Sequence, residues 1–420
     1  MVSFSPDGQR FATAGNNGAV SIWNLEGHQL TKVIKGQRET LSSMTLSLRQ
    51  TQIKNVSFSP DWQCIATVGE DGTVQIWNRT TGRQVAELKE NQGKIYQVTF
   101  SPDGKRIATV GEDGTVELWN LSGRQLAEFR SHQAWIDQVT FSPDGQHLAT
   151  VAKVKESIDL TIEGIGASTT KSKEPDITVK LWNLSGQPLA QLKGHQGYFV
   201  TVRFSPDGQR IATAGWDGTA KLWDLSGRQL AELKSQGEIN DVKFSPNGEH
   251  LATVGTDDTV QFWDLSGKQL FQWKVAHNET DRVNSMRISF SPDGQRIAIA
   301  GKDHKVHIWD VSGQHLIELK GNQISVFEMS FSSDGQRITT LEYDKARVWD
   351  LSGHQLAEFD NAESFSPDGQ FVATLEDGKV QLRRVRGLLD EQLAQGCDWL
   401  KDYFASHPED LKDLKVCQNR

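Results

Sequence analysis

One five-residue phrase, Phe-Ser-Pro-Asp-Gly or a close variant, recurs nine times along this chain of 420 residues. The copies begin at Phe4, Phe58, Phe100, Phe141, Phe204, Phe244, Phe290, Phe331 and Phe365. Most copies are followed by a Trp-Asn or Trp-Asp pair, whose tryptophans are Trp23, Trp77, Trp119, Trp182, Trp223, Trp263, Trp309 and Trp349. Self-similarity at a period of about 40 residues predicts stacked units, each burying its apolar faces against its neighbours. Such an array favours binding over catalysis.

A single repeat, residues 94–129, predicts four antiparallel strands. Residues 95–100, 106–110, 115–119 and 125–129 are short runs with alternating or β-branched residues, which are typical of strands. Between them lie Pro-Asp-Gly, Asp-Gly and Ser-Gly turns, in which glycine accepts a positive φ. Four strands in each repeat make one blade, and a ring of such blades leaves only short sheet edges.

These residues resemble the WD40 repeat family. The resemblance covers residues 2–382, about nine tenths of the chain, and is carried by runs such as 111–119 and by the Trp-Asp or Trp-Asn endings. It implies an all-β WD40 β-propeller over residues 1–382, with nine repeat units of which the first and last are incomplete.

In this family a His, a Ser or Thr, the turn Asp and the Trp often form a buried hydrogen-bond chain, so we interpret the eight tryptophans as structural. The structural turn aspartates are Asp71, Asp113, Asp217, Asp257 and Asp303. The expected hydroxyl position holds glycine in most repeats: Gly69, Gly111, Gly215, Gly255 and Gly301. We therefore expect no chain of four in most blades, and turn aspartates that accept backbone N–H groups instead.

The number of blades depends on how the ring closes. The chain starts at the stump of a first strand, and its ninth unit has three strands with Arg383-Arg384 at the expected Trp-Asp position. WD40 rings close when an early strand completes the last blade. Closure by residues 28–35 gives eight blades, which we prefer, and closure by 84–89 gives seven; a ring of nine would lack its closing strand. Because the chain begins inside a blade, we interpret its first residues as the result of a truncation of a longer polypeptide.

Beyond the repeats, residues 383–420 change to a helical period, with Leu389, Leu393, Cys397, Leu400 and Phe404 at three- to four-residue steps. This tail resembles the endings of cyanobacterial-type multidomain WD-repeat proteins, which implies a bacterial context. It also implies an alternative function: the sensor or autoinhibitory half of a signalling protein whose ATPase, kinase or protease-like domain lies upstream or on another chain.

Composition and motifs exclude several classes of function. The net charge is −9 without a basic stripe, which argues against nucleic acid as a partner. No apolar run reaches the roughly 20 residues of a membrane helix, and there is no export signal. Three scattered cysteines fit a cytoplasmic protein without disulfides. Because no catalytic, phosphate-binding or metal-binding motif occurs, we expect a non-enzyme without cofactor, metal or small-molecule substrate.

Function is expected where the repeats differ. Three insertions, at residues 36–52, 153–175 and 276–284, emerge on one face of the predicted disc. Unusual aromatics fall on the same face, namely Tyr96, Trp135, Tyr198 and Trp216. We predict that they bind a protein partner as a hot-spot cluster, the alternative being that they cover one another or the flank of the second insertion. The predicted function is thus a non-enzymatic protein–protein interaction scaffold with a loop-decorated rim.

Overall fold

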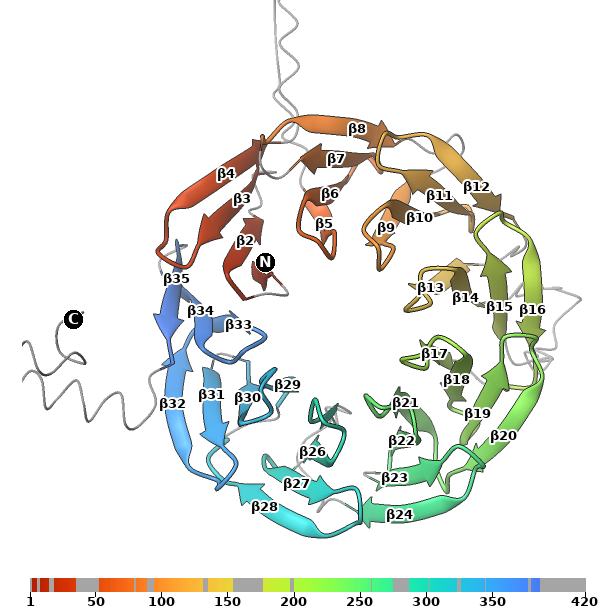
Figure 1. Ribbon diagram of the computed structural model, residues 1–420, viewed down its shortest axis with the longest axis vertical. Helices are drawn as coiled ribbons and strands as arrows, with labels where there is room; N and C mark the ends of the chain where they lie inside the picture. Colours follow the sequence, from red (N-terminus) through yellow and green to blue (C-terminus); the bar gives the residue numbers. More distant parts are fainter. Residues whose placement is uncertain are drawn as a thin grey trace, which may run out of the picture.

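A computed structural model describes residues 2–5, 8–14, 19–34, 53–78, 81–88, 94–130, 135–153, 177–196, 200–257, 259–274, 287–301, 303–322, 326–343, 345–376 and 379–385. These residues form 35 strands and no helix. The strands build nine small sheets arranged as blades around a central axis, with the first strand of each blade innermost (Figure 1).

The strands have four positions in the blades, counted from the central axis outward. The first strands are β1 (Val2–Phe4), β5 (Ile53–Phe58), β9 (Ile95–Phe100), β13 (Trp135–Phe141), β17 (Val200–Phe204), β21 (Ile239–Phe244), β25 (Arg287–Phe290), β29 (Glu328–Phe331) and β33 (Ala362–Phe365). The second strands are β2 (Arg10–Ala14), β6 (Cys64–Gly69), β10 (Arg106–Gly111), β14 (His147–Lys153), β18 (Arg210–Gly215), β22 (His250–Gly255), β26 (Arg296–Ala300), β30 (Arg337–Leu341) and β34 (Phe371–Glu376).

The third strands are β3 (Ala19–Asn24), β7 (Val74–Asn78), β11 (Val116–Asn120), β15 (Ile177–Asn183), β19 (Thr219–Asp224), β23 (Thr259–Asp264), β27 (Val306–Asp310), β31 (Lys345–Asp350) and β35 (Lys379–Arg384). The fourth strands are β4 (Gln29–Ile34), β8 (Gln84–Leu88), β12 (Gln125–Phe129), β16 (Pro188–Leu192), β20 (Gln229–Lys234), β24 (Gln269–Lys274), β28 (His315–Leu319) and β32 (Gln355–Asp360). Blades 1 to 9 are numbered in chain order, so that blade 3, for example, is β9–β12.

The blade count corrects our preferred prediction of eight. Strand β4 pairs with β3 and strand β8 pairs with β7, so neither is available to complete the last blade. Among the described residues, blade 9 therefore has three strands and the ring contains nine blades. Side-chain packing rather than a strand ladder joins its ends, because Phe4 and Phe11 of blade 1 pack on Ala373 of blade 9.

The core lies between neighbouring blades rather than inside any one of them. Val116, Leu118 and Phe129 of blade 3 pack against Ile136 and Trp182 of blade 4, and all five side chains are buried. Equivalent clusters recur around the ring. Each blade is thus stabilised mainly by burying apolar surface against its neighbours, as the repeat predicted.

The recurring Ser-Pro-Asp-Gly phrase forms a hydrogen-bonded turn between the first and second strands. In blade 3 the buried Ser101 hydroxyl accepts the Arg106 N–H at 3.0 Å and donates to Asp103 Oδ1 at 2.6 Å. Gly104 ends the turn with a φ of 67°, a left-handed conformation that glycine adopts without steric cost. Trp62 replaces this glycine in blade 2, with a φ of 56° and its ring stacked on Phe58.

The C-terminal part of the chain is only partly described. Strand β35 continues to Arg384, and residues 386–420, which carry most of the expected helical tail with Cys397 and Cys417, lie outside the described residues. Within the described ranges, no helix is long and apolar enough to cross a membrane.

Candidate functional site

Strand order places the candidate site on one face of the disc, here called the connection face. In a blade of four antiparallel strands, the turn between the second and third strands and the connection to the next blade emerge on the same side. All three predicted insertions attach there, between β4 and β5, β14 and β15, and β24 and β25. Nearly all of their residues lie outside the described ranges.

Two of the predicted aromatics meet directly on the connection face. The rings of Tyr96 in β9 and Trp135 in β13 stack with centroids 4.5 Å apart and planes at 11°. The Tyr96 hydroxyl donates a hydrogen bond to the carbonyl oxygen of Ile136, which fixes the ring across the junction of blades 3 and 4. Trp135 nevertheless remains 41% exposed. The stack therefore combines local packing with a large accessible indole surface.

The other two predicted aromatics are placed differently. Trp216 lies in the turn between β18 and β19 of blade 5, where it is 40% exposed. Tyr198 lies outside the described residues. Among the described residues, the stack of Tyr96 on Trp135 is therefore the contact that joins two of the four predicted aromatics.

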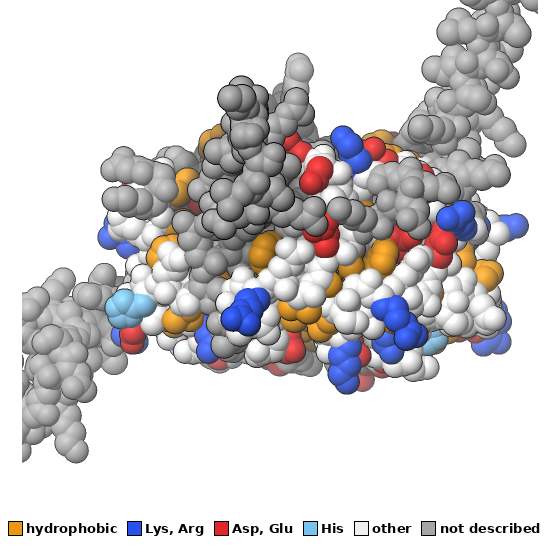
Figure 2. Space-filling view, turned by 90° about the horizontal axis from the view of Figure 1, so that it is seen from above, with side chains coloured by type: hydrophobic (Ala, Val, Ile, Leu, Met, Phe, Trp, Pro, Cys, Tyr) orange, Lys and Arg blue, Asp and Glu red, His pale blue; other side chains and the backbone are white. Residues whose placement is uncertain are grey.

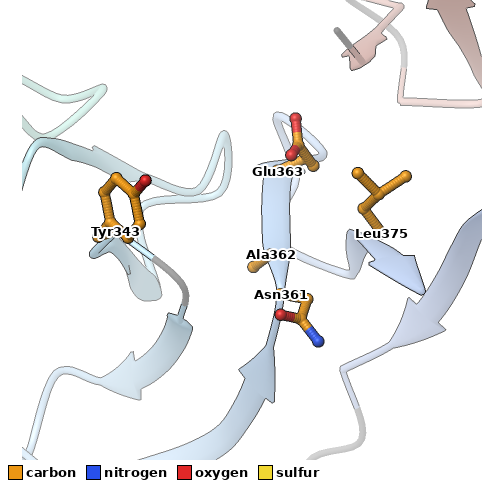
Figure 3. Close-up of a pocket in the computed structure, with 5 residues that line it drawn as sticks. All are labelled: Tyr343, Asn361, Ala362, Glu363 and Leu375. Atoms are coloured by element: carbon orange, nitrogen blue, oxygen red, sulfur yellow. The ribbon is translucent and has the colours of Figure 1, made fainter. Parts of the chain in front are cut away.

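Sequence reasoning missed a hollow farther around the same face. It has a volume of about 370 Å³ and is lined by Tyr343, Asn361, Ala362, Glu363 and Leu375. Figure 3 shows Tyr343 on one side of β33 and Leu375 on the other. Tyr343 is 87% exposed, and it occupies a turn that lacks the usual Asp-Gly. The departure of this turn from the repeat was the signal that could have found it.

A charged network on the innermost strands was also missed. Arg203 of β17 forms an ion pair with Asp241 of β21 at 3.2 Å, and Lys243 donates to the carbonyl oxygen of Ile288 at 2.7 Å. Burial lowers the pKa of Lys243, with Asp241 acting in the opposite direction. These three charged side chains are thus paired with one another or with a backbone oxygen.

The buried hydrogen-bond chain differs from our expectation. The hydroxyl is supplied by a threonine two residues before the glycine, as in blade 5, where the Trp223 Nε1–H donates to Thr213 Oγ1 at 2.9 Å. Thr213 Oγ1 also lies 2.8 Å from His195 Nε2, and His195 Nδ1 lies 3.0 Å from Asp217 Oδ2. The full chain of four therefore exists in blade 5. The same Trp–Thr bond recurs at Thr13, Thr67, Thr109, Thr150, Thr253 and Thr340.

The turn aspartates accept hydrogen bonds from the backbone two residues later. Asp217 accepts the Thr219 N–H at 2.9 Å and, across the blade connection, the Gln196 N–H at 2.9 Å. Burial raises the pKa of Asp217, but the hydrogen bonds from His195 and Gln196 outweigh it and lower the pKa to about 2. The equivalent backbone bond occurs at Asp71, Asp113, Asp257 and Asp303.

Blade 7 is an exception to the Trp–Thr bond. Ile299 stands where the other blades have threonine, and the buried Trp309 Nε1 has no hydrogen-bond partner within the described part of the chain. Its indole instead lies edge-on to His315 with centroids 4.5 Å apart. His315 Nε2 lies 3.4 Å from His307 Nδ1. Within the described ranges, no group of three or more His, Cys, Asp or Glu side chains could hold a metal ion.

The outer wall has a mixed surface. Figure 2, which views the disc from its edge, shows Lys and Arg side chains interspersed with Asp and Glu, and apolar side chains between them. Single apolar side chains of the fourth strands, such as Leu189 at 44%, are exposed there. Isolated exposures of this kind are ordinary for a protein surface, unlike stacked aromatics.

Comparisons with known proteins agree with this architecture. A model of the IFT122 first beta-propeller matches residues 172–363, a model of the anaphase-promoting complex subunit 4 WD40 domain matches residues 56–144, and a model of the WD domain, G-beta repeat, matches residues 1–24.

Relatives among curated proteins are similar over short segments. Ribosome assembly protein 4 of Chaetomium thermophilum is 44% identical over 71 residues, which make up 16% of this chain and 14% of that protein. Protein HIR1 of Candida albicans is 28% identical over 95 residues, or 22% of this chain and 10% of that protein. The matches thus span a small part of each relative. Both are fungal proteins, and they do not support the bacterial context inferred from the tail.

Two solved structures have a similar fold. The C-terminal WD40 domain of Sif2 matches with a TM-score of 0.55 at 18% identity, covering 81% of this chain and 91% of that one. The computationally designed Ika8 protein matches with a TM-score of 0.55 at 22% identity, covering 81% and 98%. At these identities the likeness concerns the fold alone. Together with the observed blades, it shows a β-propeller fold of the WD40 type, and the family models match parts of the chain.

Proposed function

We propose that this chain is a non-enzymatic interaction scaffold that binds a protein partner on its connection face. The observation that carries the proposal is the stack of Tyr96 and Trp135, in which a 41% exposed indole is held by a buttressing ring. A large aromatic surface that is already ordered loses little conformational entropy on binding. Aromatic side chains of this kind are enriched among the residues that dominate interface energies.

The neighbouring surface is consistent with such a role. Trp216 presents a second exposed indole on blade 5, on the same face. The attachment of all three insertions to this face also distinguishes it from the face of the Ser-Pro-Asp-Gly turns, which repeats the same short turn in every blade. The solved structures named above share the fold of this chain.

The proposal is tested by affinity capture from the native lysate, with the wild type compared against Trp135→Ala and Trp216→Ala. Truncation of a hot-spot tryptophan costs about 2 kcal/mol or more of binding free energy, so specific partners should be strongly depleted. Leu189→Ala is the matched control, because Leu189 has a similar exposure of 44% on the outer wall of blade 4. A partner set that is unchanged in both tryptophan variants would contradict the proposal, provided that thermal unfolding shows all variants folded.

A further inference from the structure

Two neighbouring blades depart from the repeat on their innermost strands, which surround the central axis (Figure 1). The residue just before the phenylalanine of the repeated phrase is Arg203 in β17 of blade 5 and Lys243 in β21 of blade 6. In the other seven blades this position holds serine or threonine: Ser3, Ser57, Thr99, Thr140, Ser289, Ser330 and Ser364. In the ladders both cationic residues lie opposite an alanine of the second strand, as Thr99 does. They therefore replace a small hydroxyl side chain at one structural position.

A third cationic side chain lies on the next blade. Arg287 begins β25 of blade 7, and its Nε donates to the carbonyl oxygen of Phe327 at 2.7 Å. Lys243 reaches toward the same strand, since its Nζ donates at 2.7 Å to the carbonyl oxygen of Ile288, the residue after Arg287. Positive charge from three successive blades thus gathers on the innermost strands.

The electrostatics of Lys243 show that the three cations lie close enough to repel one another. Burial lowers the pKa of Lys243, and the carboxylate of Asp241 acts in the opposite direction. The guanidinium groups of Arg203 and Arg287 both lower the pKa of Lys243 further, because like charges disfavour its protonated form. An anion that lies among the three cations would relieve this repulsion.

Two carboxylates interact with this cluster among the described residues, and they balance its charge only in part. Asp241 pairs with Arg203 at 3.2 Å. Glu328 of β29 interacts with Arg287, but burial raises the pKa of Glu328, which favours its neutral form. Three cations thus face two carboxylates, and one of these carboxylates is less readily ionised than an ordinary glutamate.

The cations keep hydrogen-bonding capacity for a ligand. A guanidinium group carries five N–H donors and an ammonium group three. Arg203 donates to Asp241 and to the carbonyl oxygen of Val202, whereas Lys243 and Arg287 each donate to one backbone oxygen. The Arg203 side chain is 40% exposed, Lys243 is half-buried and Arg287 is exposed. Donors of the cluster are therefore accessible from solvent.

We propose that the innermost strands of blades 5 to 7 bind a small multivalent anion of the phosphate class through Arg203, Lys243 and Arg287. A phosphate-type group brings two or more negative charges and oxygens that point in several directions, so it can accept from cations on three strands at once. A single carboxylate brings one charge and two coplanar oxygens, and Asp241 already supplies such a group. This site goes beyond the proposed function and uses none of the residues of the Trp135 surface, so either proposal can fail alone.

Isothermal titration calorimetry on the full chain tests the proposal, with pyrophosphate as the probe and sodium chloride at matched ionic strength as the reference. Pyrophosphate should bind saturably with one site per chain, and acetate should not. Lys243→Thr, which introduces the kind of residue that the other blades carry, should weaken pyrophosphate binding about 10-fold or more. Lys234→Thr is the matched control and should leave binding unchanged, because Lys234 lies on the fourth strand of blade 5 with its side chain 75% exposed.

Two more variants keep the test decisive if Lys243→Thr does not fold. Arg287→Gln changes an exposed side chain and should also weaken pyrophosphate binding, whereas Lys243→Arg keeps the charge and should retain most of it. Trp135→Ala should leave it unchanged. The proposal is overturned if pyrophosphate shows no saturable binding beyond the chloride reference, or if the folded variants Lys243→Thr and Arg287→Gln bind it like the wild type. Equal weakening by Lys234→Thr would mean unspecific attraction to surface charge, and would also overturn it.

Discussion

Replacing Thr213 by valine tests whether the hydrogen-bond chain of blade 5 stabilises the ring. Thr213 is fully buried, and its hydroxyl connects the Trp223 indole to His195. Because His195 Nδ1 faces the carboxylate of Asp217, we assign the proton to Nδ1, and Nε2 then accepts from the threonine hydroxyl. Valine keeps the shape of the side chain but leaves one buried donor and one buried acceptor without partners.

The expected loss of stability can be judged by comparing Thr213→Val with Thr253→Val in the same chain. A buried polar group that loses its partner costs about 1–3 kcal/mol. Thr253→Val leaves only the indole N–H of Trp263 without a partner, and it should lower the free energy of unfolding by about that much. Thr213→Val leaves two groups without partners, the Trp223 N–H and His195 Nε2. Its loss of unfolding free energy should therefore be about twice as large.

The assay is equilibrium urea unfolding of both variants and the wild type. Far-UV circular dichroism and tryptophan fluorescence should give coincident transitions, which is the condition for comparing free energies. At equal slopes, the shift in midpoint measures the change in stability. If Thr213→Val is no more destabilising than Thr253→Val, the contacts of His195 and Asp217 do not contribute to stability and the reasoning is wrong.

Three further predictions concern single positions. The pKa of Asp217 is lowered from 3.8 to about 2. Its contribution of roughly 2 kcal/mol to the free energy of unfolding is therefore present above pH 4 and lost as the pH falls toward 2. Asp217→Asn should flatten the pH dependence of the free energy of unfolding between these pH values. Arg347→Met should destabilise the fold by about 3–5 kcal/mol because it leaves Glu342 buried without its counter-charge. The double variant with Glu342→Leu should recover most of this loss, and thermal or urea unfolding measures both changes. Trp62→Gly should relieve the strain of a positive φ but remove the ring stack on Phe58. We expect the free energy of unfolding in urea to fall by about 2 kcal/mol or more. A rise in this free energy would mean that backbone strain outweighs the packing of the ring.

The blade was predictable from the sequence, but the number of blades was not. Turn chemistry and strand alternation are local, so the segment 94–129 predicted its four strands within a residue or two. Ring size depends on the angle between neighbouring blades and on how the two ends meet. We assumed closure through a shared sheet, whereas Phe4 and Phe11 close the ring by packing on Ala373.

The hydrogen-bond chain was misplaced for a related reason. Choosing the partner of an indole requires the register between two strands, and the sequence alone did not provide that register. In the ladder, Thr109 lies opposite Glu117, two residues from Trp119, and so its hydroxyl rather than the position of Gly111 meets the indole.

The face on which the candidate residues lie was predictable from the sequence, whereas their contacts were not. Strand order placed Tyr96, Trp135 and Trp216 on one face, but whether two rings touch is decided by side-chain geometry. Tyr343 lies in a turn that departs from the repeat without an insertion, so a prediction based mainly on inserted loops missed it.

The most direct test of the interaction scaffold is photo-crosslinking from position 135. With benzoylphenylalanine in place of Trp135, illumination in the native lysate should give a discrete covalent product with a partner protein. The same group at Leu189, which has a similar exposure of 44%, should not give that product. No product from position 135, or the same products from both positions, would contradict the claim that the connection face carries the function of this chain.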